Sequence, residues 1–281
     1  MAPHAPHVSM SPPPIIILYD LPSHNPQPWA PNIWKVRYVY SLASVRSSLT
    51  FVCRFILNYK KLHYRTTWVE FPDVDATLRS IGAPPSAYRN DGRPIYSLPV
   101  IVDPSRSPMA PTILSNANTI AEYLESTYPA RPVFPEGSRA LQSLFVHYVQ
   151  EVFSKPLLPI MIPISHDRLP QRSQSHFRHP DHPTAVTPPH PTNGNRSEQA
   201  WYAVQQQFDF LATILDKNAG VDGDGVVVMG RDLTYADFAL CSVLLWIEKM
   251  SPYDGWARIR QWNGGRWSRL WDRCRDYMDV Y

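Results

Sequence analysis

The sequence has few cysteines and no long apolar run. Cys53, Cys241 and Cys274 are its only cysteines, and their odd number and wide spacing provide neither a disulfide framework nor a Cys-x-x-Cys pair for redox chemistry or zinc. The longest apolar stretches, such as residues 238–247, reach about half the length of a membrane-spanning helix. Residues 1–10 lack the basic start and apolar middle of a secretory signal. We therefore expect a cytoplasmic protein with reduced thiols and no membrane segment.

An excess of one charge is also missing. The formal net charge of +3 is too small to indicate a nucleic-acid or anionic-membrane partner. Hydrophobic residues make up 44% and charged residues 18%, which excludes wholesale disorder, a coiled coil and a collagen-like fibre. The length of 281 residues, at roughly 100–200 residues per domain, favours two domains.

Proline, in contrast, is abundant. The chain has 30 prolines, about twice the average usage of roughly 5%. Nine fall within residues 1–31 and nine within 156–191, whereas 199–217 and 233–250 contain none. This distribution predicts two proline-rich connectors that alternate with continuous helix, and a disordered tail over residues 1–14.

The first half of the chain alternates between strand and helix patterns. The continuously apolar run from Ile15 to Tyr19 predicts a strand buried on both faces. A helix that begins near Pro31 is expected to finish at residues 57–61. Further strands are predicted over 63–70, 96–102 and 112–114, and further helices over 74–81 and 115–128.

No comparable strands follow Pro129. Helical periodicity recurs over residues 140–153, 198–218, 234–248 and 266–277. A β/α half followed by an all-helical half predicts two domains, 15–130 and 131–281, joined near residues 130–135.

Two local motifs carry the functional argument. Leu98-Pro99 begins an apolar strand, and the polar turn Ser115-Asn116-Ala117 opens a helix about 16 residues later. Thr234-Tyr235-Ala236-Asp237 precedes the apolar stretch 238–247. Thr234 can cap that helix and Asp237 can reach back to it, which is an acidic variant of the capping box.

In their order and spacing these motifs resemble the cytosolic glutathione transferases. Leu18-Tyr19-Asp20, the segment 29–38 and Leu57-Asn58-Tyr59-Lys60 resemble, more narrowly, the fungal-specific class A transferases related to lignin β-etherases. The resemblance covers residues 15–130 and 138–281. It implies an α/β thioredoxin-like N-terminal domain, with a cis-proline at Pro99, and an all-α C-terminal domain.

The resemblance implies an enzyme that attacks electrophiles with the thiolate of bound glutathione, because the thiolate is the nucleophile. The expected helix start at Trp29 to Asn32 favours an anion there. The family usually has a Ser at the position of Ala30, whose hydroxyl donates a hydrogen bond to the sulfur, and alanine cannot donate. Asn32 has two N–H donors and is the best local substitute, or else it only caps the helix. Ala30 and Asn32 are thus the candidate catalytic positions, and Trp29 is expected to contact glutathione.

The rest of glutathione is expected at the second motif. The resemblance implies that the backbone of Leu98, before Pro99, pairs with the cysteinyl part. Asn116 and Ala117 stand where the family has an acidic residue and a Ser for the γ-glutamyl group. Asn116 can still form hydrogen bonds there, and Ser115 can supply a hydroxyl if the turn shifts by one residue. Helix capping by Ser115 or Asn116 is the alternative.

The electrophile is expected in a cleft between the domains, where ligand pockets commonly form. The predicted apolar wall comprises Phe145, Tyr148, Val149, Val152 and Phe153, for each of which core packing is the alternative. Such a wall suits a flat apolar or phenolic compound. A competing function is a non-catalytic, ligandin-type protein that binds phenolic compounds, because Ala30 and residues 116–117 depart from the family. Family habit implies a homodimer, and no nucleic acid, membrane or metal is expected as a partner.

Two other groups of residues look functional. Five histidines lie in one proline-rich stretch, without a cysteine and without a helix to bring them together, which predicts a solvated loop rather than a metal site: His166, His176, His179, His182 and His190. The arginines and tryptophans of residues 258–275 predict an amphipathic helix that covers the core rather than a nucleic-acid surface.

Two segments depart from the family pattern. Residues 39–55, which include Cys53, interrupt the first helix, and their removal would leave one uninterrupted amphipathic helix. Residues 179–195 are rich in Pro, His and Thr where helix and linker are expected. We interpret both segments as introns read through in frame, which full-length transcript sequencing would test. A glutaredoxin-like thiol transferase is disfavoured, since no cysteine stands near the start of the first helix.

Overall fold

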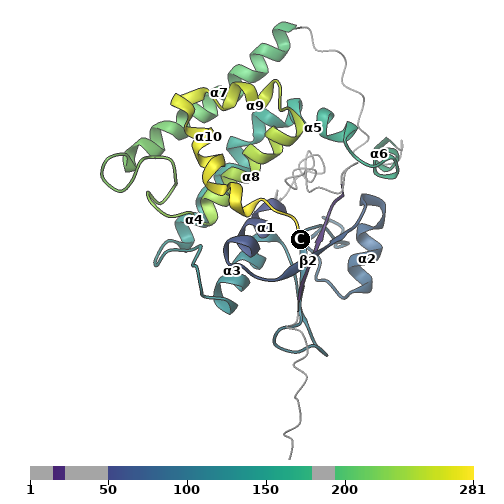
Figure 1. The fold of residues 1–281 in the computed structure, drawn as a ribbon. Helices are drawn as coiled ribbons and strands as arrows, with labels where there is room; N and C mark the ends of the chain where they lie inside the picture. Colours follow the sequence, from purple (N-terminus) through teal and green to yellow (C-terminus); the bar gives the residue numbers. More distant parts are fainter. Residues whose placement is uncertain (1–14, 23–49, 179–193) are drawn as a thin grey trace, which may run out of the picture.

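The computed structural model describes residues 15–22, 50–178 and 194–281, and within them strands alternate with helices before the chain becomes helical (Figure 1). This order of elements confirms the predicted fold class. The strands are β1 (Ile16–Asp20), β2 (Tyr64–Trp68), β3 (Ala87–Tyr88), β4 (Pro94–Ile95), β5 (Val100–Asp103) and β6 (Thr112–Ser115).

Four of these strands form a mixed sheet in the order β2-β1-β5-β6, in which only β1 and β2 are parallel neighbours. Helices α1 (Thr50–Tyr59) and α3 (Ala117–Thr127) lie on one face, and α2 (Val74–Ser80) lies on the other (Figure 1). Successive side chains of β1 point to opposite faces of the sheet, which explains why helices cover both faces. Ile16 and Leu18 join the core under α1 and α3, while Tyr19 packs against the smaller core under α2. This is the thioredoxin-like arrangement.

The hairpin of β3 and β4 was not predicted. Each of its strands has two residues, too few for a periodic pattern to show in the sequence. Gly92, with φ +80°, lies in the connecting turn and supplies a left-handed conformation that other residues rarely adopt.

The second half is helical. Its helices are α4 (Arg139–Tyr148), α5 (Leu158–Asp167), α6 (Gln171–Arg178), α7 (Gly194–Leu215), α8 (Tyr235–Met250), α9 (Gly255–Ile259) and α10 (Trp262–Cys274). A π-helical turn, η3 (Val149–Phe153), continues α4, and short 3₁₀ turns are η2 (Phe71–Asp73), η4 (Lys155–Leu157), η5 (Asp216–Asn218) and η6 (Arg275–Tyr277). Helix α8 is buried almost all round, as its continuous apolar sequence predicts.

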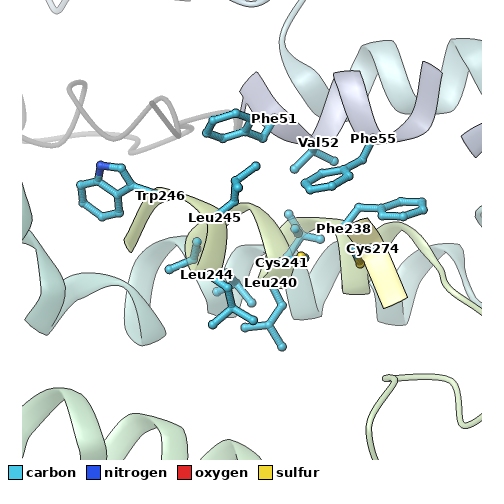
Figure 2. Close-up of a cluster of buried hydrophobic side chains, with 14 of the residues drawn as sticks. Phe51, Val52, Phe55, Phe238, Leu240, Cys241, Leu244, Leu245, Trp246 and Cys274 are labelled. Atoms are coloured by element: carbon cyan, nitrogen blue, oxygen red, sulfur yellow. The ribbon is translucent and has the colours of Figure 1, made fainter. Parts of the chain in front are cut away.

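Helix α1 connects the two halves by packing against α8 (Figure 2). The rings of Phe55 and Phe238 stack with centroids 5.5 Å apart and an angle of 8° between their planes. Phe51 and Val52 extend the same apolar seam toward Leu245 (Figure 2). The domains therefore share one continuous hydrophobic core.

A buried ion pair fixes the connection between the domains. Lys60, at the end of α1, lies 2.7 Å from Glu125 of α3. The Glu125 carboxylate also accepts hydrogen bonds from the backbone N–H groups of Val133 (3.1 Å) and Phe134 (3.3 Å). The Lys60 ammonium donates to the carbonyl of Tyr128 at 2.9 Å. The segment that joins the two domains is thus held at Tyr128 on one side and at Val133 and Phe134 on the other.

The last residues of the chain run back onto the sheet. The N–H and hydroxyl of Thr66 in β2 donate to the carbonyl oxygen of Tyr281 at 2.9 and 2.7 Å. The amide of Asn58 donates to the carbonyls of Tyr277 and Asp279, both at 2.8 Å. The two bonds from Thr66 lie on the outer edge of β2, and those from Asn58 hold the final residues against α1.

Two expectations about connectors require correction. Residues 156–178 were predicted to be a proline-rich connector, but they contain α5 and α6. Pro159 lies in the first turn of α5, where its missing N–H has no helical partner to lose, and Pro163 is accommodated inside the helix. His166 lies on α5 and is buried, so the prediction of a solvated loop is wrong for this residue. His176 lies on α6, and His179, His182 and His190 lie outside the described residues.

The segment interpreted as the first insertion, 39–55, overlaps α1. Residues 39–49 lie outside the described part of the chain. Phe51, Val52, Cys53 and Phe55 are not looped out but belong to α1 and are buried in the shared core. Of the second segment, 179–193 are likewise not described, and 194–195 begin α7.

Candidate functional site

The start of β5 and the end of β6, which carry predicted site residues, meet the end of β1 at one edge of the sheet. Val100, the first residue of β5, lies opposite Tyr19 of β1 and opposite Ser115 of β6. The residues that adjoin these three, among them Pro99 and Asn116, therefore lie at the same edge. The fold brings the two halves of the first motif together, although they are separated in the sequence.

The peptide bond between Leu98 and Pro99 is cis, as the resemblance implied. Proline has no N–H, so the paired residues of β5 begin after it, at Val100. The side chain of Leu98 is buried in the small core with Leu78. The backbone N–H and C=O of Leu98 remain outside the strand pairing and are the groups that a peptide ligand could pair with.

Asn116 caps α3. Its side-chain Oδ1 accepts a hydrogen bond from the backbone N–H of Asn118 at 3.0 Å, so the capping alternative describes what Asn116 does in this structure. Its φ of +78° is in the left-handed region, which asparagine tolerates better than most residues. The Ser115 hydroxyl donates to the carbonyl of Pro84 at 2.7 Å and is used within the fold. Ala117 is buried, which leaves only its backbone N–H to face a ligand.

The start of α3 can attract an anion. The helix has 11 residues and no acidic side chain in its first turn, so no negative charge there competes for the N–H groups that the Asn116 cap leaves unpaired. Such an end stabilises a nearby negative charge by roughly 0.3–1 kcal/mol. A carboxylate of a small peptide suits this position.

The predicted thiol site cannot be placed. Trp29, Ala30 and Asn32 lie outside the described residues. The chain enters that segment from β1, whose last residue is Asp20, and returns from it into α1.

A buried ion pair joins β1 to α1 beside this edge. The Arg54 guanidinium lies 2.8 Å from the Asp20 carboxylate, and it also donates to the Thr66 hydroxyl at 2.9 Å. Asp20 accepts a further bond from the N–H of Leu21 at 2.7 Å. Sequence analysis assigned no role to this pair, although Asp20 belongs to the motif Leu18-Tyr19-Asp20. The pair fixes where β1 ends relative to α1.

The predicted apolar wall divides into two groups. Val149 and Phe153 are fully buried in the main core, so core packing describes these two. Phe145 and Tyr148 are half-buried, and Val152 is 47% exposed. These three side chains keep surface that a ligand could contact.

Helix α6 connects the helical half to the same edge of the sheet. The Arg172 guanidinium donates to both carboxylate oxygens of Asp73, at 2.9 and 3.0 Å. The Ser173 hydroxyl donates to Glu70 at 3.1 Å. Glu70 follows β2, and because β2 runs parallel to β1 it ends at this edge. Sequence analysis missed α6 because of its polar, proline-flanked sequence.

The other candidate groups form no site in the described part of the chain. No three His, Cys, Asp or Glu side chains among the described residues are placed to hold a metal ion. Trp267 and Leu270 of α10 are buried and Arg266 donates to the carbonyl of Ala212 at 2.6 Å, so α10 covers the core as predicted. Within the described ranges, no helix has both the length and the apolar character to cross a membrane.

Residues 140–277 match the family model described as glutathione S-transferase, C-terminal domain. The solved structure of glutathione transferase GSTFuA3 from Phanerochaete chrysosporium is 31% identical, with a TM-score of 0.76 over 95% of this chain and 98% of that one. The chain belongs to the glutathione transferase family.

Two further relatives add detail. CsGST63524 of Ceriporiopsis subvermispora, solved in complex with glutathione, is 30% identical, with a TM-score of 0.80 over 95% of this chain and 99% of that one. The glutathione S-transferase-like protein ustS of Aspergillus flavus is 25% identical over 240 residues, which are 83% of this chain and 85% of that protein. The glutathione transferase fold therefore spans nearly the whole chain.

Proposed function

We propose that this glutathione transferase family member binds glutathione at the sheet edge formed by Leu98, Pro99 and the start of α3. The observation that carries the proposal is the cis Leu98–Pro99 bond beside a capped helix start, which Val100 and Ser115 bring together by strand pairing. A solved relative of 30% identity holds glutathione, which supports the same ligand here.

In this proposal each part of glutathione has its own group. The backbone of Leu98 pairs with the cysteinyl residue. The γ-glutamyl carboxylate lies at the start of α3, near the N–H of Ala117 and the side-chain amide of Asn116. Asn116 replaces the acidic residue of the family, and Ser115 uses its hydroxyl for Pro84, so affinity is expected to be lower than in a typical member.

The proposed reaction is attack by the glutathione thiolate on an aromatic, phenolic or ether-containing electrophile. Ala30 cannot donate to the sulfur, and Asn32 or the helix-end amides are proposed to do so. A hydrogen bond to a charged group contributes roughly 1.5–3 kcal/mol, so replacement of the usual Ser weakens thiolate formation by about 10- to 150-fold without abolishing it. Half-buried Phe145 and Tyr148, together with exposed Val152, are the accessible part of the proposed wall for the electrophile.

Calorimetry with glutathione tests binding first. Heat of association is expected for the folded chain, and its absence would refute the proposed site. The pKa of bound glutathione, measured by thiolate absorbance in wild type and Asn32→Ala, then tests the catalytic position. An unchanged pKa would remove Asn32 from that role.

A non-catalytic role in binding phenolic compounds is the alternative, and one observation favours it beyond the loss of the usual Ser at Ala30. An open surface hollow of about 470 Å³ lies on α7, α9 and α10, and aromatic and polar side chains line it together: Trp201, Tyr202, Trp262, Glu198, Gln199, Gln205 and Arg258. Conjugation of a generic aromatic electrophile with glutathione separates the two functions, because a pure binding protein would bind an apolar fluorescent dye but show no turnover.

We further propose that the protein belongs to the fungal-specific class A group, that it forms a homodimer, and that it acts in the cytoplasm. The similarity to GSTFuA3 supports the group. Exposed apolar side chains on α4 and α7 support a second copy as partner: Leu141, Leu144, Phe210 and Ile214. Cys53, Cys241 and Cys274 are buried free thiols, which suits a reducing compartment.

A further inference from the structure

The hydroxyl group of Tyr235 reaches from the helical domain to the first turn of α3. Tyr235 is the first residue of α8 and is almost fully buried. Its hydroxyl donates a hydrogen bond to the side-chain Oδ1 of Asn118. Asn118 is the second residue of α3, two positions after the cap. A residue of one domain thus holds the helix start at which the other domain is proposed to bind a ligand.

Asn118 is also bonded to Asn116, the residue that caps α3. The backbone N–H of Asn118 donates to Oδ1 of Asn116 at 3.0 Å. Ala117 lies between them as the first residue of α3. Its methyl group is in the core, and its backbone N–H has no partner within the helix because of its position in the first turn. The turn 116–118 is therefore fixed on one side by its own cap and on the other by Tyr235.

Tyr235 is itself held rigidly. Its N–H donates to the carbonyl of Val133 at 2.9 Å, and its ring packs against Phe134 with centroids 4.9 Å apart. The next N–H, of Ala236, donates to the side chain of Gln142 at 2.7 Å. A side chain fixed in this way does not have to be ordered when a ligand arrives, which is the condition for preorganisation.

Tyr235 acts as a donor throughout the physiological pH range. Burial raises the pKa of its phenol well above the ordinary value, so the hydroxyl keeps its proton. Removal of the hydroxyl would leave Oδ1 of Asn118 without this donor and would allow the side chain to turn. The polar groups at the start of α3 would then no longer be held in one arrangement.

We propose that Tyr235 is a positioning residue for glutathione: through Asn118 it holds the turn 116–118 in the arrangement that receives the γ-glutamyl carboxylate. This inference rests on the proposed function. It adds a residue of the helical domain to a site built otherwise from the thioredoxin-like domain. Tyr235 does not touch the ligand and acts through the orientation of the first turn of α3.

The test is Tyr235→Phe, which removes the hydroxyl and keeps the ring in the core. The dissociation constant for glutathione, measured by calorimetry, is expected to rise about 3- to 10-fold, the range for the loss of one hydrogen bond. Turnover at saturating glutathione and the KM for a generic aromatic electrophile are expected to stay within about two-fold. The double variant Tyr235→Phe/Asn118→Ala is expected to bind no more weakly than Asn118→Ala alone.

Tyr128→Phe is the matched control. The Tyr128 hydroxyl bonds Asp103 at 2.8 Å and Ser105 at 2.9 Å, at the end of β5 opposite to Pro99. This variant loses a hydroxyl of the same kind and is expected to keep the wild-type affinity for glutathione.

Three results would overturn the inference. They are an unchanged affinity in Tyr235→Phe, an equal loss of affinity in Tyr128→Phe, and additive losses in the double variant. If the wild type binds glutathione and any of these is found, the inference fails and the proposed function stands. If the folded wild type binds no glutathione, both fail.

Discussion

Asp237 is a fully buried carboxyl group that joins the start of α8 to the loop before it. Its Oδ1 accepts a hydrogen bond from the N–H of Val228 at 2.7 Å. Its Oδ2 accepts from the N–H of Thr234 at 2.9 Å and from the Thr234 hydroxyl at 2.7 Å. Burial raises the pKa of Asp237 to about 6, although these hydrogen bonds oppose the rise.

This pKa predicts a specific dependence of stability on pH. An aspartate in the unfolded chain loses its proton near pH 4, whereas folded Asp237 keeps it to about pH 6. The folded state therefore binds more protons in this window, and the free energy of unfolding falls as pH rises from about 4 to 6, then levels. A difference of about two pKa units corresponds to ~3 kcal/mol.

Urea unfolding of wild type and Asp237→Asn between pH 4 and 8 measures this effect. The difference between the two free energies of unfolding is expected to decline across the window, because asparagine does not titrate. Parallel curves would show that Asp237 does not titrate there.

Single residues show which features of the site could be predicted. The reach of Asp237 back to Thr234 was predicted, because both groups lie in one short motif. The cis bond at Pro99 was implied by the resemblance to the glutathione transferases and not by the Leu-Pro pair alone. The Tyr235 to Asn118 bond was not predictable, since its partners lie 117 residues apart and only the packing of two domains brings them together.

At the scale of elements, the Lys60–Glu125 pair joins α1 and α3 to the interdomain linker. Glu125→Gln is expected to lower the free energy of unfolding by about 3–5 kcal/mol, because it leaves the Lys60 ammonium buried without its countercharge. Chemical denaturation measures the loss.

The variant Lys60→Met/Glu125→Leu is the control for that prediction. It removes both charges and is expected to lose less stability than the single variant, since no uncompensated charge remains. A double variant less stable than Glu125→Gln would contradict this account.

Elements were predictable where a pattern is both long and local. Helices α3 and α8 have apolar faces of several turns and were predicted within two residues at each end. Helix α5 was missed because its prolines mimic a connector. The end of the segment 39–55 was misjudged because Arg54-Phe55 resembles Arg37-Tyr38, so the sequence permits either pair to continue into Ile56. In the structure Arg54 belongs to α1 and forms the ion pair with Asp20.

For the whole molecule, the exposed apolar face of α4 and α7 predicts association. Leu141 and Leu144 are 66% and 63% exposed, and Phe210 is 54% exposed. Leu144→Glu is expected to convert a homodimer to a monomer, because it would place a charge in the contact. Light scattering after size-exclusion chromatography measures the mass.

Tyr253→Glu is the control for the dimer prediction. Tyr253 is 96% exposed on the loop between α8 and α9. The Arg258–Glu198 ion pair places α9 beside the first turns of α7, whereas Phe210 and Ile214 lie in its last turns, so this substitution is expected to leave the mass unchanged. A wild-type monomer would contradict the prediction, as would a Leu144→Glu variant that remains dimeric.

The return of the final residues onto β2 has a consequence for colloidal behaviour. β2 is the outermost strand of the sheet, and an uncovered strand edge is a template on which another chain can add. The carbonyl of Tyr281 occupies the N–H of Thr66 and so blocks that edge. Release of residues 279–281 from β2 would uncover this edge and is expected to favour association of molecules by strand addition.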